Sequence, residues 1–511
     1  MKKIKYIGLM LLAVNFAACD ADNYLDRIVA ETVVLPDATS GSADFSNYVA
    51  IGASFSAGFS DGSVFLAAQS RSFPNIMANK MASMGGGAFT QPLVADNIGG
   101  LTLGGNQISN PRLFFNGAGP AVHPGTPGTE VSAVIAGPYN NMGVPGAKSF
   151  HMVAPGYGSV ANVQLGLANP YFARMASTPT ATVLGDAASQ GATFFTISEI
   201  GGNDVLAYAT SGGVGVVQTG NLDPTTYGSN DITDPNVFAN VFNTMVTTMT
   251  ANGAKGAVVT VPSIVNLPYF TTVPYNAIPL DANTAALVNG GYATYNASLA
   301  AAITGANALG GLGLTPAEIA AEVAKRTINF SAGQNAVVII DEDLTDLTGI
   351  NSQLLSMRQA TADDFLVLTS SSFLGTTVGG NPLLINGVSV PLADKWVLTP
   401  EEQNNIQTAV DAYNATISAL GSANDLAVVD LNQLLTEAAN GGTAFDNFSM
   451  STSLVFGGMV SLDGIHLTSR GYALMANKIL EAIDSKYGSN FAASGNLAKA
   501  DDYPTNYPPG I

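Results

Sequence analysis

The chain has 511 residues, 47% of them hydrophobic, and a formal net charge of −19 from 18 Lys and Arg against 37 Asp and Glu. A chain of this length buries roughly three quarters of its unfolded surface, so that its core alone can stabilise the fold. The negative charge argues against nucleic acid as a partner. The single cysteine excludes internal disulfides and zinc sites built from several cysteines.

The start of the chain predicts a secretory signal. A basic pentapeptide, residues 1–5, precedes an apolar stretch, residues 6–18, which is too short to span a membrane as a helix. The segment that follows is polar and acidic and shows little helix or strand periodicity, and we interpret it as a tether. We therefore expect a signal peptide over residues 1–18 and a tether over residues 19–44.

The cysteine directly follows the predicted signal peptide, in the sequence Phe16-Ala17-Ala18-Cys19. This tetrapeptide resembles the bacterial lipobox, in which the Cys is acylated, for example with palmitate, and becomes the mature N-terminus. The resemblance implies a lipoprotein held by its lipid at the bacterial cell envelope, on the outer membrane or cell surface. A plain secretory signal with an incidental cysteine is the alternative.

Short β-branched or aromatic runs, each followed by turn residues, predict four strands, at residues 48–51, 193–198, 256–262 and 426–430. Helices are predicted before the last two. One covers residues 236–252 with apolar residues on one face, and the other begins at Thr399-Pro400. Apolar strands alternating with helices favour a parallel, doubly wound sheet, in which sites lie at the C-terminal ends of strands.

Glycine-rich insertions interrupt this pattern at residues 85–137 and 211–235. A larger block, residues 301–394, has its own predicted helix and strand, and we interpret it as a cap. The main domain is expected over residues 45–490. The remainder, residues 491–511, is rich in Ala, Asn and Pro and is expected at the periphery.

The residues with catalytic potential lie far apart in the chain. Asp463 comes three positions before His466 on a short polar turn, a spacing that can place the carboxylate against one imidazole nitrogen. Ser54 follows the first predicted strand at a small-residue turn and is the candidate nucleophile. Ser56 is an adjacent alternative for that role.

Two further turns offer donors for a developing oxyanion. Asn203 follows a glycine pair directly after the second predicted strand, and its side-chain amide can donate. Gly146 offers a backbone N–H with no Cβ in the way. Taken singly, Asn203 could be a turn former and His466 a helix-capping residue.

Four segments, in this order, resemble the blocks of the SGNH (GDSL-type) hydrolase family. They are Gly52-Ala53-Ser54-Phe55, Val144-Pro145-Gly146-Ala147, Gly201-Gly202-Asn203-Asp204 and Asp463-Gly464-Ile465-His466. No single block is specific, but four in order are. The α/β-hydrolases, the common alternative among secreted serine esterases, have a Gly-x-Ser-x-Gly elbow and an acid well upstream of the His, and neither is present here.

The resemblance implies a flavodoxin-like three-layer α/β/α fold and ester hydrolysis without metal or cofactor. Carried over by position, Ser54 is the nucleophile, His466 the general base and then acid, and Asp463 its orienting carboxylate. The oxyanion hole is then formed by the amides of Ser54 and Gly146 and by the side chain of Asn203. The family usually has Asp where this chain has Ala53, which puts the positioning of the nucleophile turn in doubt.

The expected function is therefore that of a serine esterase or lipase acting on a small-molecule or lipid carboxylic ester. A carbohydrate esterase that removes acetyl groups from glycans would use the same residues. A non-catalytic surface binding lipoprotein is the alternative from another class. His123 and His151 lie in loops without a second ligand at metal spacing and are expected to be surface or packing residues.

Overall fold

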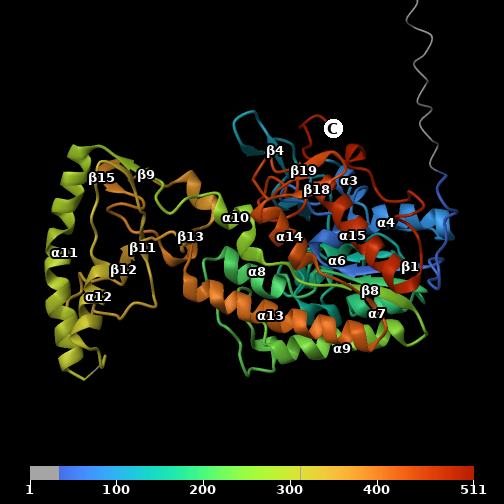
Figure 1. Ribbon diagram of the computed structural model, residues 1–511, viewed down its shortest axis with the longest axis horizontal. Coiled ribbons are helices and arrows are strands. Elements are labelled where there is room, and N and C mark those ends of the chain that lie inside the picture. Colours follow the sequence, from blue (N-terminus) through green and yellow to red (C-terminus); the bar gives the residue numbers. More distant parts are fainter. Residues whose placement is uncertain (1–33, 311) are drawn as a thin grey trace, which may run out of the picture. The chain divides into compact units, whose positions relative to one another are not determined.

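The structure is a computed structural model in which residues 34–310 and 312–511 are described. A parallel sheet lies at the centre of its main domain, the larger part at the right of Figure 1. Its strands are β1 (Tyr48–Gly52), β6 (Asn141–Gly143), β7 (Phe194–Ile197), β8 (Lys255–Val259) and β17 (Ala427–Val429). They lie in the order β17-β8-β7-β1-β6, and every neighbouring pair is parallel. Counted along the chain this order is 2-1-3-4-5, one of the two common doubly wound orders. The predicted parallel α/β sheet is confirmed.

One strand of the sheet differs from the expectation. The segment Asn141–Gly143 reads as a loop in the sequence, but in the structure it is β6 and pairs with β1, with Met142 opposite Ile51. Asn and Gly are poor strand formers, and three residues are too few to show an alternating pattern. The strand forms because all three residues are buried beside β1, so that pairing satisfies their backbone groups.

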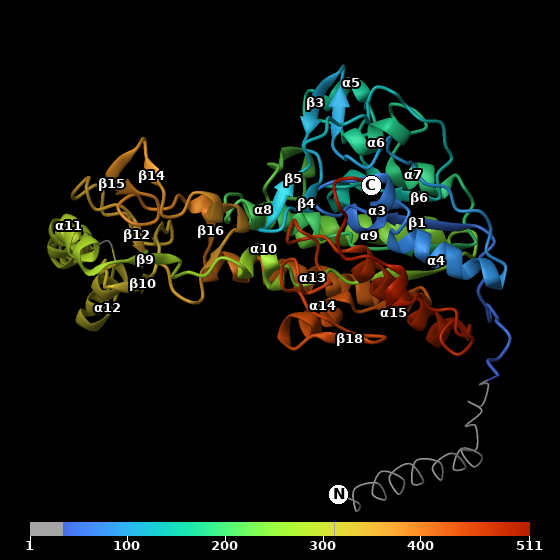
Figure 2. The same cartoon turned by 90° about the horizontal axis from the view of Figure 1, so that it is seen from above.

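Helices cover both faces of the sheet. On one face α9 (Pro235–Thr250) packs against α13 (Pro400–Ala423), which contacts β8 and β17. On the other, α4 (Phe73–Met81) packs against α15 (Ser469–Tyr487), and Figures 1 and 2 show the two pairs on opposite sides of the strands. The apolar faces predicted for the first pair are buried: in α9 Val237, Val241, Met245 and Met249, and in α13 Ile406, Val410, Tyr413 and Ile417.

The insertion has a hydrophobic core of its own, which draws residues from Val273 to Val397. It is therefore longer than the expected block at residues 301–394. Its helices are α11 (Ala282–Ala308) and α12 (Pro316–Arg326). Its strands form small antiparallel pairs: β9 (Ile278–Leu280) with β10 (Gly333–Asn335), β11 (Val338–Ile340) with β12 (Met357–Gln359), β13 (Phe365–Leu366) with β16 (Val397–Leu398), and β14 (Thr377–Val378) with β15 (Asn381–Ile385).

Other described elements lie outside the sheet and the insertion. The longer loops carry three hairpins: β2 (Leu101–Leu103) with β3 (Asn106–Ser109), β4 (Leu113–Phe115) with β5 (Pro120–Val122), and β18 (Thr443–Phe445) with β19 (Phe448–Met450). Shorter helices are α3 (Leu66–Gln69), α5 (Val160–Val163), α6 (Pro170–Met175), α7 (Val183–Ala188), α10 (Pro268–Thr271) and α14 (Leu431–Asn440). Of these, α7 contacts β1 and α9.

The two flanks of the main domain pack into its core. The compact unit runs from Ala38 to Ile511 and so begins before residue 45. Phe491 is completely buried, with its ring centroid 5.5 Å from that of Phe45, and Tyr507 is buried as well. The segment after residue 491 is therefore not peripheral, because a few apolar side chains among its polar residues fill the core.

The predicted signal peptide, Cys19 and most of the tether lie outside the described residues. Within residues 34–310 and 312–511, no helix has the length and apolar character needed to cross a membrane.

A buried charge network holds the insertion together and gives a stability prediction. The guanidinium of Arg358 donates to Asp341 and makes two hydrogen bonds of 2.6 Å with Asp364, and all three side chains are buried. Replacing Arg358 with Met leaves buried Asp364 without a cation and leaves buried Asp341 only the half-exposed Lys325, at 3.8 Å. We expect the free energy of unfolding, measured by chemical denaturation, to fall by about 3–5 kcal/mol.

The matched control is Lys478→Met, which breaks the half-exposed ion pair with Glu481 at 3.0 Å. Exposed pairs contribute only about 0–1 kcal/mol, so this variant should unfold close to the wild type. Equal losses in the two variants would contradict a special role for the buried network.

Candidate active site

Ser54 opens α2 (Ser54–Ala57), the short helix that follows β1. The turn is tight, and this explains the glycine at its start. A Cβ on Gly52 would lie 2.0 Å from the hydroxyl oxygen of Ser56 and 2.9 Å from a carboxylate oxygen of Glu199. Ser56 is completely buried, whereas Ser54 keeps 7% of its surface exposed, which favours Ser54 as the reactive hydroxyl.

Asp463 and His466 form the expected pair. The Nδ1 atom of His466 lies 2.9 Å from Oδ2 of Asp463, and the backbone N–H of His466 donates to Oδ1 at 2.8 Å. The same carboxylate accepts from the N–H groups of Gly62 and Ile465 and from the hydroxyl of Ser461. An ionised Asp463 can only accept a hydrogen bond. In a neutral imidazole the ring proton therefore lies on Nδ1, and Nε2 of His466 is unprotonated.

The electrostatics keep this carboxylate charged. Burial raises the pKa of Asp463, but the neighbouring His466 and the hydrogen bonds outweigh that effect and hold the pKa below its ordinary value. A carboxylate accepting several N–H bonds is stabilised in its charged form. The group can therefore orient the imidazole and stabilise an imidazolium without taking up the proton itself.

Aromatic contacts bring His466 to the nucleophile turn. Its ring centroid lies 4.4 Å from that of Phe59 and 5.9 Å from that of Phe55, the residue after Ser54. Within residues 34–310 and 312–511, no hydrogen bond joins the Ser54 hydroxyl to His466. The structure thus brings the two segments together and forms the Asp–His hydrogen bond, but not the Ser–His hydrogen bond.

The two predicted oxyanion donors also lie side by side. Asn203 opens α8 (Asn203–Thr210), directly after the turn that follows β7, and its amide nitrogen donates to the carbonyl of Ala147 at 3.0 Å. Gly146 precedes Ala147 and has a φ of +79°, in the region that favours glycine. Because a side-chain amide carries two hydrogens, Asn203 keeps one for another acceptor.

The sheet topology explains why these turns meet. The strands β6, β1 and β7 are neighbours in the sheet, and Gly146, Ser54 and Asn203 follow their C-terminal ends. From β1 the chain first adds β6 on one side of the sheet and then adds β7, β8 and β17 on the other side. The position between β1 and β7 is therefore a topological switch point, where open α/β sheets bind ligands. The sequence predicts this edge for Ser54 and Asn203, whose motifs follow apolar runs, but not for Gly146, because β6 reads as a loop in the sequence.

Two hollows flank the site. A cavity of about 1170 Å³ is lined by Gly146, Asn203 and Ile465, among others. A groove of about 440 Å³ is lined by Phe59, His466 and again Ile465. His151 lines the cavity as a packing residue, stacked on Tyr157 at 4.2 Å, and burial followed by the Lys148 charge lowers its pKa to about 4.

Glu199 is a site residue that the sequence does not reveal. It follows β7 in a left-handed conformation, with a φ of +50°, and its buried side chain reaches the nucleophile turn. One carboxylate oxygen accepts from the N–H groups of Ala53 at 2.5 Å and Ser56 at 2.8 Å, and the other accepts from the Ser198 hydroxyl at 2.9 Å. Glu199 therefore holds this turn although position 53 is Ala.

Burial raises the pKa of Glu199 to about 7, against the opposing effect of these hydrogen bonds. Asp61 is a second such residue. It accepts from the N–H of Leu462 at 3.0 Å and thereby fixes the turn that carries Asp463. Burial first, and then the charge of Asp463, raise the pKa of Asp61 to about 7. No spacing rule finds these two acids, because their partners are distant in sequence.

Comparison with known proteins gives no relative: no family model, curated protein or solved structure matches this chain. The described residues nevertheless place a serine hydroxyl, an oriented imidazole and N–H donors at one edge of the sheet, and groups of these kinds can carry out nucleophilic acyl transfer.

The contacts of Glu199 predict how the nucleophile turn responds to substitution. In Glu199→Ala the two N–H groups lose their shared acceptor inside the protein, at a cost of about 1–3 kcal/mol for each buried donor. Glu199→Gln is the matched variant, because its amide oxygen can still accept from both. We expect thermal unfolding to show a much larger loss for Ala than for Gln. Equal losses would mean that the negative charge, rather than an acceptor, holds the turn.

Proposed function

We propose that this protein is a serine ester hydrolase of the SGNH type. The observation that carries the proposal is the Asp463–His466 pair, whose imidazole contacts Phe55 inside α2, directly after Ser54, and Phe59 just beyond the end of α2. The strand order and the position of the three turns at neighbouring strand ends also support it. The missing Ser–His hydrogen bond is compatible with this role, since catalytic hydrogen bonds commonly shorten only when substrate binds.

The reaction would proceed through an acyl-enzyme. The Ser54 oxygen attacks the ester carbonyl carbon while Nε2 of His466 takes the hydroxyl proton. The resulting oxyanion is held by the N–H groups of Ser54 and Gly146 and by the amide of Asn203. Its collapse breaks the bond to the alkoxy group, which leaves as the alcohol with the proton from His466.

Hydrolysis of the acyl-enzyme repeats these steps with water. Nε2 of His466 takes a proton from the water, whose oxygen attacks the acyl carbon. The second oxyanion collapses, the bond to the Ser54 oxygen breaks, and His466 returns the proton to that oxygen. Asp463 remains ionised throughout and stabilises the imidazolium in both halves.

The two hollows support an ester with substantial groups on both sides of the carbonyl. The larger cavity lies on the side of Gly146 and Asn203 and has apolar walls that include Leu206 and Val241. The groove lies on the side of His466 and is lined by Tyr269 of α10 and Leu368, a residue of the insertion. We propose that the insertion contributes to substrate selection through this groove.

We also retain, as a proposal, that the protein is a lipid-anchored member of the bacterial cell envelope. This rests on the signal-like start of the chain and on Cys19.

The first test is hydrolysis of p-nitrophenyl acetate, butyrate and palmitate by the wild type and by Ser54→Ala. We expect turnover in the wild type and its loss, to the rate of the uncatalysed reaction, in the variant. Ser56→Ala is the matched control and should keep most of the activity, because that hydroxyl is buried. The chain-length profile separates a lipase from a short-acyl esterase.

Activity that survives in Ser54→Ala would contradict the assignment of the nucleophile. A folded wild type that releases acetate from acetylated xylan but cleaves no p-nitrophenyl ester would be a carbohydrate esterase. If the folded protein hydrolysed no ester at all, the result would favour the alternative that it is a non-catalytic binding lipoprotein.

Asn203→Ala tests the oxyanion hole. If the amide donates to the oxyanion, its removal should lower kcat by ~10²–10³ with a smaller effect on KM. Asn236→Ala is the matched control, because this asparagine lines the same cavity without taking part in the proposed chemistry. An unchanged kcat in Asn203→Ala would remove this residue from the mechanism.

A further inference from the structure

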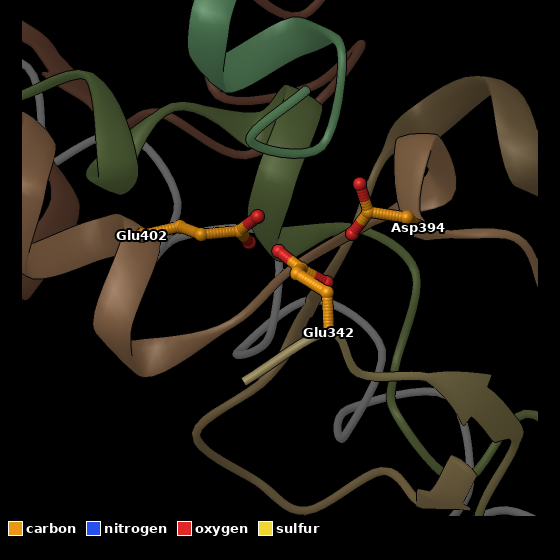
Figure 3. Close-up of side chains that lie close together, drawn as sticks. All are labelled: Glu342, Asp394 and Glu402. Atoms are coloured by element: carbon orange, nitrogen blue, oxygen red, sulfur yellow. The ribbon is translucent and has the colours of Figure 1, made fainter. Parts of the chain in front are cut away.

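Three carboxylates converge away from the active site, and none of them takes part in the proposed reaction. Glu342 follows β11, Asp394 opens the short helix η7 (Asp394–Trp396), and Glu402 lies in the first turn of α13. One oxygen of each lies within 4.8 Å of the others. Figure 3 shows the three side chains pointing toward one another from separate segments.

Glu402 is the group that the protein itself leaves unsatisfied. Its side chain is only 3% exposed, and one carboxylate oxygen accepts from the N–H of Thr399 at 2.7 Å. The other oxygen, Oε1, is buried and has no hydrogen-bond partner. Oδ1 of Asp394 is in the same state. A buried carboxylate oxygen without a donor is costly, so each of these two oxygens needs either a proton shared with Glu342 or a bound cation.

The backbone of two glycines lies directly against this cluster. A Cβ on Gly213, which has a φ of +79°, would lie 1.6 Å from Oε1 of Glu402. A Cβ on Gly212 would lie 2.4 Å from the carbonyl oxygen of Asp394. This glycine pair follows α8 and packs against Asp394 and Glu402. A side chain at either glycine would overlap with atoms of these two residues.

The charge around the cluster is not compensated by the protein. Within residues 34–310 and 312–511, no Lys or Arg forms an ion pair with Glu342, Asp394 or Glu402. The nearest lysine in sequence, Lys395, places its ammonium over the Trp396 ring, 5.0 Å from the centroid.

We propose that Glu342, Asp394 and Glu402 bind a calcium ion that fastens the insertion to helix α13. The donors are all carboxylate oxygens, which hard cations prefer. Three carboxylates contributed by separate segments suit the irregular, oxygen-rich coordination of Ca²⁺ better than Mg²⁺, which is usually held by one or two carboxylates and its own waters. The ion would be structural, and the proposal does not depend on the proposed ester hydrolysis.

The single tryptophan of the chain provides a direct probe, because Trp396 lies two residues after Asp394. Tb³⁺ occupies Ca²⁺ sites and luminesces when a nearby tryptophan is excited. We expect saturable Tb³⁺ emission on excitation of the purified wild-type protein, displaced by Ca²⁺. Added Ca²⁺ should also raise the melting temperature by a few degrees, because it binds only the folded chain.

Two isosteric variants test the ligands. Glu402→Gln keeps an oxygen that can accept from the Thr399 N–H, and Asp394→Asn changes a second ligand in the same way. Each should weaken Ca²⁺ binding by at least about tenfold, the effect of losing even an outer partner of a metal ligand. Glu401→Gln is the matched control, because it removes the same charge from the adjacent exposed residue and should bind as the wild type does.

Other outcomes would overturn the proposal. A wild type that shows neither Tb³⁺ emission nor stabilisation by Ca²⁺ has a cluster that shares protons instead. Equal binding by the wild type and Glu402→Gln would place the ion elsewhere. Stabilisation by Mg²⁺ but not by Ca²⁺ would contradict the choice of calcium.

Discussion

A single buried carboxylate, that of Glu199, connects the end of β7 to the turn after β1, and the candidate active site depends on this link. The two strands are neighbours, with Ile51 opposite Ile197, so the acid starts next to the turn that it holds. Its oxygens accept from Ala53, Ser56 and Ser198. Because one carboxylate oxygen accepts from two N–H groups of the turn at once, one side chain can fix the whole turn.

The acids of the site show how environment separates chemically similar groups. Asp463 accepts hydrogen bonds from several directions and lies against His466, and its pKa falls. Asp61 and Glu199 are also hydrogen-bonded, but burial dominates, and their pKa values rise to about 7. An active site commonly assigns roles to its acids by such opposing shifts. Here the shifts single out Asp463 as the one suited to remain charged beside an imidazole.

The sequence is informative wherever a signal is local. The strands rich in Val, Ile and Phe, the capped helix from Thr399 and the Asp463–His466 spacing all follow from neighbouring residues, and the structure contains each of them. The misses depend on distant partners. β6 is a strand only because it lies beside β1, and Glu199 matters only because of residues more than 140 positions earlier. Phe491 and Tyr507 looked peripheral because their neighbours in sequence are polar, although their neighbours in space are aromatic.

The burial of the final segment has a consequence for how the protein folds. The backbone of Ser42 pairs with Tyr487, and the completely buried guanidinium of Arg112 donates to the carbonyls of Tyr507 and Pro508. These contacts span most of the chain, so the last of them form only after residue 508 has left the ribosome. Contacts of such long sequence separation slow folding, because the loop entropy is lost before the contacts form. Apolar surface that these contacts cover stays exposed until they form, and exposed surface of this kind makes large chains prone to aggregate while they fold.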